Sequence, residues 1–186
     1  MSGIAVDKLS LRYWDDPVLS KVCDKIEGSE FGPQLEEFSR QLIATMDASN
    51  GVGLAAPQVG VTKRLFVMRF PDHKGAPPIA VCNPVLILSG ERLPGQEGCL
   101  SLPNIFDQVY RAGHVNMTYT TPSGEAVELL LDMWDARVAQ HEFDHLNGIM
   151  FFDYKDQRPT YGARMSKQVS KNVLRKWEKS HGNYRP

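Results

Sequence analysis

The segment that most constrains how this chain can fold is Gln140-His141-Glu142-Phe143-Asp144-His145. It contains no Gly, Pro or β-branched residue, and Gly148 follows where a helix should end. The pattern therefore predicts a helix from about Trp134 to Asn147. On such a helix, side chains four residues apart point the same way, so two imidazoles share one face.

This face allows two interpretations. His141 and His145 can bind one divalent metal, and Glu142 is then close enough to handle a proton on a water that the metal activates. The alternative is a core helix that carries two hydrogen-bonded histidines. A single histidine would favour the alternative. Two at this spacing, with a Glu between them, favour metal binding.

The other predicted elements are a mixture of helix and short strands. We expect a helix that Gly32-Pro33 opens and that runs to Ala48, and a last helix at about 160–180 that Thr160 caps. The strand patterns cover 64–70, 79–89 with a break at Asn83-Pro84, and a hairpin of 115–121 and 126–131. The fold class that follows is α+β. Antiparallel β-strands pack around the central metal-binding HExxH helix, with one N-terminal and one C-terminal helix.

The length of 186 residues predicts one domain over 1–186, large enough for a core without disulfides. A net charge of −1 gives no field for nucleic acid or an anionic membrane, and no apolar run is long enough to span a bilayer. Residues 1–10 lack the apolar stretch of a secretion signal. Three cysteines cannot all pair within one chain, so we expect free thiols and a reducing, cytoplasmic setting. We also expect a monomer.

A catalytic metal usually has three protein ligands, so the two histidines need a third. No downstream His or Glu stands at a spacing typical of the known zinc proteases. Upstream, Cys99 lies in the segment Glu97-Gly98-Cys99-Leu100-Ser101, which we expect to be turn-like. A thiolate with two imidazoles suits zinc or ferrous iron. Cys99 could instead be a small buried hydrophobic residue, as we expect for Cys23 and Cys82.

A third unusual segment is Gly51-Val52-Gly53-Leu54-Ala55-Ala56-Pro57-Gln58-Val59-Gly60. Its small residues and lack of periodicity suggest a loop whose backbone something approaches closely. A plain connecting loop is the alternative, which the lone polar residue Gln58 makes less attractive. Together with the cysteine and histidine segments, and in this order, it resembles the three signature motifs of peptide deformylase. Weaker matches extend the resemblance to about residues 10–155.

The resemblance implies a reaction and a metal. The family is a metal-dependent hydrolase that removes the N-formyl group from the N-terminal methionine of newly synthesised polypeptides and releases formate. Its native metal is Fe²⁺, and Zn²⁺, Ni²⁺ or Co²⁺ can occupy the site. The ligands would be Cys99, His141 and His145. Nascent formylmethionyl peptides are the implied partner, and contact with the ribosome is left open.

The resemblance also implies residue roles. Glu142 would take a proton from the water and deliver it to the leaving amine. The side-chain amide of Gln58 and the backbone N–H of Leu100 would stabilise the oxyanion. The expected substrate-binding residues are Val52, Gly53, Glu97, Trp134 and Val138, and Glu97 is also expected to fix the cysteine segment.

Two positions depart from the family pattern. Phe106 stands where the family often has an arginine, and Met133 stands where a glycine is common. Two other functions are alternatives, and each would need a further ligand. A zinc peptidase of the HExxH type lacks its downstream ligand here. A structural metal would need a fourth ligand, for which His114 or Cys82 could serve in principle, but no spacing points to either.

Overall fold

The structure, a computed structural model, describes residues 8–154 and 160–161. Within these residues, the chain forms two α-helices, six strands and four short 3₁₀ helices. The α-helices are α1, Pro33–Ala48, and α2, Met133–Leu146. The strands are β1, Gly53–Ala55; β2, Leu65–Met68; β3, Ile79–Cys99; β4, Leu102–Thr120; β5, Ala126–Asp132; and β6, Thr160–Tyr161. The 3₁₀ helices are η1, Pro17–Ser20; η2, Gly28–Glu30; η3, Ala56–Val59; and η4, Phe151–Asp153.

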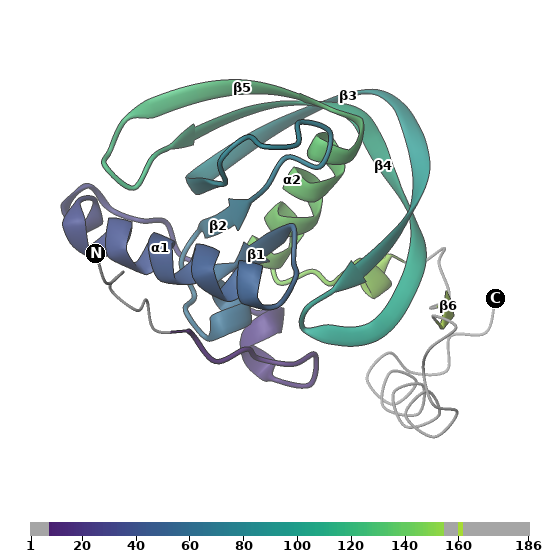
Figure 1. The fold of residues 1–186 in the computed structure, drawn as a ribbon, viewed down its shortest axis with the longest axis horizontal. Coiled ribbons are helices and arrows are strands. Elements are labelled where there is room, and N and C mark those ends of the chain that lie inside the picture. Colours follow the sequence, from purple (N-terminus) through teal and green to yellow (C-terminus); the bar gives the residue numbers. More distant parts are fainter. Residues whose placement is uncertain (1–7, 155–159, 162–186) are drawn as a thin grey trace.

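The strands form one antiparallel sheet in the order β1-β2-β3-β4-β5, and β6 adds to β4 near Ile105 and Phe106. β3 and β4 make a long hairpin that curves past α2 (Figure 1). The sheet and helices confirm the α+β fold class, with antiparallel strands around the helix that carries the two histidines.

Strand β2 shows how the core is divided. All four of its side chains are buried. Phe66 and Met68 pack in one cluster with Ala136 and Ala139 of α2. Leu65 and Val67 face the other way, into a cluster that includes Leu42 and Met46 of α1. Because alternate residues of a strand point to opposite faces, the sheet is covered by α2 on one side and by α1 on the other.

Strand β3 is much longer than the expected segment 79–89. The register with β4 shifts between Cys82 and Val85 and again between Ser89 and Arg92. Asn83 has φ 50°, and its side chain bonds both backbone groups of Ile26. Asn83-Pro84 therefore marks a bulge within a continuing strand, not a break.

Two other expectations about local structure were wrong. Glu97 to Cys99 is the end of β3, and the turn consists of Leu100 and Ser101. The segment 51–60 is not simply a loop, because it contains β1 and η3. Among the described strands, β1 is an edge strand of the sheet, so its backbone can pair with another chain.

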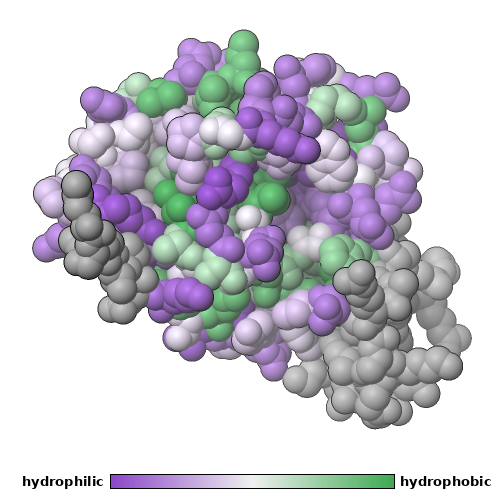
Figure 2. All heavy atoms as spheres, in the orientation of Figure 1, coloured by the Kyte–Doolittle hydropathy of each residue, from purple (hydrophilic) through white to green (hydrophobic). Residues whose placement is uncertain are grey.

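The ends of the helices agree with the sequence signals. Gly32 caps α1 with Pro33 at its first position, and Gly148, at φ 70°, follows α2. The expected helix at about 160–180 lies outside the described residues except for its start, where Thr160 is in strand β6 and not a helix cap. No described helix is long and apolar enough to cross a membrane. On the face shown in Figure 2, hydrophobic residues gather toward the middle, between hydrophilic ones.

Candidate active site

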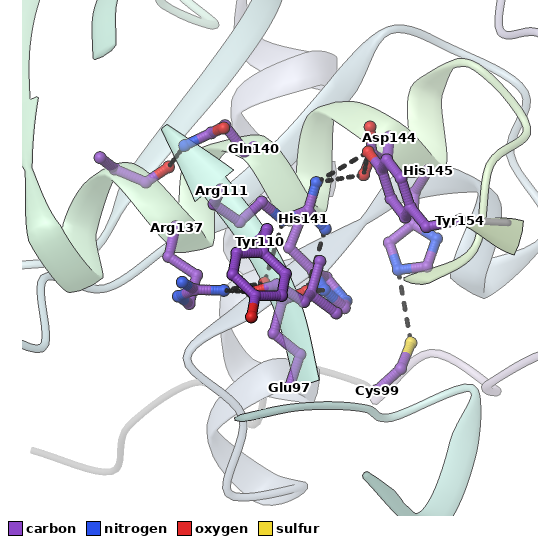
Figure 3. A network of polar contacts seen from close by, with 12 residues as sticks. Glu97, Cys99, Tyr110, Arg111, Arg137, Gln140, His141, Asp144, His145 and Tyr154 are labelled. Atoms are coloured by element: carbon purple, nitrogen blue, oxygen red, sulfur yellow. Dashed lines mark hydrogen bonds and ion pairs between the residues drawn. The ribbon is translucent and has the colours of Figure 1, made fainter. Parts of the chain in front are cut away.

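Three donor atoms from two elements meet at one point. The Sγ atom of Cys99 and one ring nitrogen each of His141 and His145 lie within 4.8 Å of one another. Cys99 ends β3, and its Sγ is 3.3 Å from Nε2 of His145 on α2 (Figure 3). Over residues 8–154 and 160–161, this is the one group of three or more such donors arranged to hold a metal ion. The donor set fits zinc or ferrous iron.

His141 is oriented by a buried carboxylate. Its Nδ1 lies 2.9 Å from Oε2 of Glu97, so an N–H donated there leaves the lone pair of Nε2 for a metal. Arg111 donates to both oxygens of Glu97 at 2.9 Å, and Arg137 donates to Oε1 at 2.7 Å (Figure 3). Arg111 also pairs with Asp144. The positive charges of the two arginines thus balance the negative charges of the two carboxylates next to the imidazole of His141.

The electrostatics of this group favour positive charge at His141. Burial raises the pKa of Glu97, but hydrogen bonds from His141 and Arg111 outweigh burial and hold that pKa well below its usual range. Burial lowers the pKa of His141, but hydrogen bonds to Cys99 and Glu97 raise it well above its usual value. Burial and the charge on His141 hold the pKa of His145 well below its usual value. A metal ion can satisfy the same attraction in place of a proton.

Glu142 is a buried carboxylic acid beside the donor atoms. Burial raises the pKa of its carboxyl to about 7. Within the described residues, Oε2 of Glu142 has no hydrogen-bond partner, and neither has Nδ1 of His145. A buried carboxylate with a vacant oxygen is suited to exchange protons with a water or substrate.

Gln58 faces the donor atoms from the opposite side. Its Oε1 accepts a hydrogen bond from the backbone N–H of Ala55 at 2.8 Å. Its Nε2 lies 3.3 Å from Sγ of Cys99 and 3.1 Å from Oγ of Ser101. The carboxamide is therefore oriented at both ends, with its Nε2 between the Sγ of Cys99 and the Oγ of Ser101.

Gly53 in β1 allows the strand to pass directly over Glu142. A Cβ atom added at Gly53 would lie 2.7 Å from Cδ of Glu142, closer than real contacts allow. The absence of a side chain at Gly53 is therefore what permits this approach.

A cavity of about 690 Å³ opens over the donor atoms. Its lining includes ten of the eleven site residues expected from the sequence: Val52, Gly53, Gln58, Glu97, Cys99, Leu100, Trp134, Val138, His141 and Glu142. The eleventh, His145, is 1% exposed and lies behind Cys99. Val52 and Trp134 are about half exposed, whereas Val138 is buried.

Several residues that support the site had no role in the sequence analysis. Ser101 is fully buried and accepts a hydrogen bond from Gln58. Gln140 joins α2 to β4 by bonding both backbone groups of Ala112. Arg137 could have been found, because a residue four positions before His141 shares its helix face. No sequence pattern pointed to Ser101 in this way.

Comparison with known proteins agrees with the geometry. Residues 8–160 match the family model described as polypeptide deformylase. A peptide deformylase of Thermotoga petrophila is 43% identical over 144 residues, which cover 77% of this chain and 84% of the relative. One of Microchaete diplosiphon is 38% identical over 175 residues, covering 89% and 92% of the two chains.

Solved structures give the same result. The Thermotoga maritima peptide deformylase has a TM-score of 0.74 at 40% identity and covers 79% of this chain and 97% of its own. A Synechococcus elongatus peptide deformylase in complex with actinonin has a TM-score of 0.75 at 33% identity and covers 98% and 95%. With a family model that spans most of its length and relatives well above 30% identity, this chain belongs to the polypeptide deformylase family.

Proposed function

We infer that this chain is a metal-dependent hydrolase that removes the N-formyl group from the N-terminal methionine of newly synthesised polypeptides and releases formate. Its family supports this reaction. The observation that carries the inference is the meeting of three donor atoms within 4.8 Å under a cavity that Glu142 also lines.

We propose that Cys99, His141 and His145 hold the metal and that the metal is Fe²⁺, with Zn²⁺, Ni²⁺ or Co²⁺ able to replace it. When bound, such an ion supplies Lewis acidity, which lowers the pKa of a water and polarises a carbonyl. A divalent ion held by one thiolate and two neutral imidazoles would carry a net positive charge together with its ligands. This charge favours the binding of an anion such as formate.

Glu142 is the proton carrier in this proposal. Its vacant Oε2 accepts a proton from the water as the water oxygen attacks the formyl carbon. When the carbon–nitrogen bond breaks, the same carboxyl gives the proton to the leaving amine. The products are a free amine at the N-terminus and formic acid, whose remaining proton passes to the amine or to solvent so that it leaves as formate, and Glu142 is again ionised. A carboxyl pKa of about 7 suits both directions of transfer.

The attack places negative charge on the former formyl oxygen. We propose that Nε2–H of Gln58 and the backbone N–H of Leu100 stabilise this oxyanion. The fixed orientation of the Gln58 carboxamide, bonded through Oε1 to Ala55, supports the role. A donor that is already oriented needs no rearrangement as the charge develops.

The cavity supplies the substrate site. We propose that Val52, Trp134 and Val138 contact the methionine side chain and that the peptide pairs with β1 at Gly53 as an added strand. Glu97 lines the cavity, but its carboxylate is bonded by His141, Arg111 and Arg137. We therefore assign Glu97 the support of His141 in preference to substrate contact.

A zinc peptidase that cleaves ordinary peptide bonds is not favoured, because the family and the upstream cysteine point to deformylation. We also propose that the protein is a cytoplasmic monomer of one domain that acts on nascent chains.

The test of function is formate release. The full chain, purified without oxygen, is assayed on formyl-Met-Ala-Ser, with Met-Ala-Ser as the matched control, and its metal content is measured. Formate from the first peptide alone, with about one metal per chain, supports the proposal. Free amino acids from the unformylated peptide would instead identify a peptidase, and an active metal-free protein would remove the metal role.

A further inference from the structure

Arg137 is a buried arginine on α2, one turn before His141. Its side chain is 8% exposed, and its donors have three separate acceptors. Nη1 lies 2.7 Å from Oε1 of Glu97 and 2.8 Å from the carbonyl oxygen of Val109 on β4. Nη2 lies 2.6 Å from the carbonyl oxygen of Leu93 on β3. One guanidinium thus joins the helix, both strands of the long hairpin and the carboxylate that orients His141.

The two arginines on Glu97 hold it in different ways. Arg111 makes a bidentate pair with Glu97 but also bonds Asp144 and the hydroxyl of Tyr154. The described hydrogen bonds of Arg137 reach no carboxylate other than Glu97, and its remaining bonds go to backbone oxygens. Arg111 therefore links side chains to one another, whereas Arg137 connects Glu97 to backbone carbonyl oxygens of β3 and β4.

We propose that Arg137 is a positioning residue for the metal site. By fixing Oε1 of Glu97 against β3 and β4, it directs Oε2 to Nδ1 of His141 and so aims Nε2 at the metal. The proposal rests on the proposed function, because it takes Cys99, His141 and His145 to be the metal ligands.

The surroundings of Arg137 are shaped to hold the guanidinium in this one place. A Cβ atom added at Gly95 of β3 would lie 2.5 Å from Cζ of Arg137. On another side, the ring of Trp134 covers the guanidinium, with its centroid 5.4 Å from Cζ. Planar stacking and a fork of several donors are properties of arginine that lysine lacks. The role should therefore depend on the geometry of the side chain and not only on its charge.

The test compares Arg137→Met with two other variants of the full chain. Arg92→Met is the matched control, because Arg92 lies on the same hairpin, is exposed and bonds only a backbone oxygen in the described hydrogen bonds. Arg137→Lys keeps the charge and loses the fork. Each protein is stripped of metal and titrated with Co²⁺, whose visible spectrum reports the geometry of a thiolate–imidazole site. Thermal unfolding of the metal-free forms measures stability separately.

For Arg137→Met we expect a Co²⁺ dissociation constant about 10- to 100-fold higher than that of the wild type, and an altered spectrum, because supports of metal-binding histidines typically have effects of this size. The value of kcat should fall by a similar factor while KM changes by less than about threefold, since a misaimed ligand affects the chemistry more than peptide binding. Arg137→Lys should recover only part of the affinity. Arg92→Met should match the wild type.

Two outcomes would overturn the proposal. One is wild-type Co²⁺ affinity and spectrum in Arg137→Met, and the other is full recovery by Arg137→Lys, which would leave charge as the whole effect. If Arg137→Met does not fold, Gly95→Ala gives the same test, because it displaces the guanidinium without removing it and should also weaken Co²⁺ binding. A wild-type protein that binds no Co²⁺ would refute the metal site itself, a result distinct from equal binding by wild type and variant.

Discussion

The two sides of the active site differ in the kinds of residue that form them. On the helix side, α2 presents His141, Glu142 and His145, backed by the buried charges of Glu97, Arg111, Arg137 and Asp144. On the loop side, residues 51–60 and 100–101 contribute small residues, neutral hydrogen bonds and backbone N–H groups, with no charged side chain. Cys99, at the end of β3, joins the histidines of the helix side as a metal donor.

This difference separates two tasks. A cation needs donors whose positions and charges are set before it arrives, which buried ion pairs on a rigid helix can provide. A peptide needs an open strand edge and neutral donors for a short-lived negative charge. We therefore expect changes at Cys99 and at the two histidines to affect the metal, and changes on the loop side to affect turnover with the metal retained.

Removal of a ligand should have the largest effect. Cys99→Ala, His141→Ala and His145→Ala should each fold, retain little metal and have no detectable activity, because three ligands are the usual minimum for a catalytic site. Metal content by elemental analysis and formate release are the measurements. Full metal occupancy in any one variant would remove that residue from the ligand set.

Glu142→Ala tests whether every helix-side residue acts through the metal. We expect this variant to keep its metal and to lose about 10²- to 10⁴-fold in kcat, the usual effect of removing a general acid–base group. Metal content and kcat are measured on the same preparation. If the metal were lost together with the activity, Glu142 would belong with the ligands.

Gln58→Leu makes the matching test on the loop side. Loss of one oxyanion donor should lower kcat by about 10²- to 10³-fold at unchanged metal content, with a smaller effect on KM. Because Oε1 of Gln58 also accepts the buried N–H of Ala55, the variant should be less stable by about 1–3 kcal/mol. Gln58→Glu should be less active than Gln58→Leu, because it places negative charge beside the forming anion. If kcat per folded molecule stayed near that of the wild type, Gln58 would only support the loop.

Gly53→Ala probes the contact between the two sides. The added Cβ would displace the carboxyl end of Glu142, which can move, so we expect normal folding and metal content. A general base that is misplaced by about 1 Å can cost up to about 10²-fold, and we expect kcat to fall by about 10- to 100-fold. Gly28→Ala is the control, since a Cβ there meets nothing within 4 Å. Equal kcat values for both variants would mean that the close approach has no catalytic importance.

The sequence predicted the helix side better than the loop side. The histidine spacing and Gly148 were enough to place α2 within a residue or two, because helical periodicity is a local signal. The length of β3 could not be predicted, because its bulges at Asn83 and near Gly90 interrupt the alternating pattern, and only pairing with β4 keeps it extended. The charged partners of Glu97 meet through strand pairing and helix packing, which composition does not reveal.

The smallest expected effect concerns Met133, which begins α2 where the family commonly has a glycine. Its φ is 47°, in the left-handed region that is costly for a residue with a side chain, and its side chain is exposed, so little packing would be lost. Met133→Gly should relieve about 1–2 kcal/mol of strain, from which the entropy that glycine loses on folding subtracts about 0.5–1 kcal/mol. The net gain of up to about 1 kcal/mol should raise Tm by at most about 2–4 °C in a chain of this size. Met133→Ala is the control, because it removes the side chain but keeps the Cβ and the strain, and its Tm should not rise. Calorimetry of all three metal-loaded proteins decides the point. A lower Tm for Met133→Gly would mean that Met133 stabilises the start of α2 by more than its strained backbone costs.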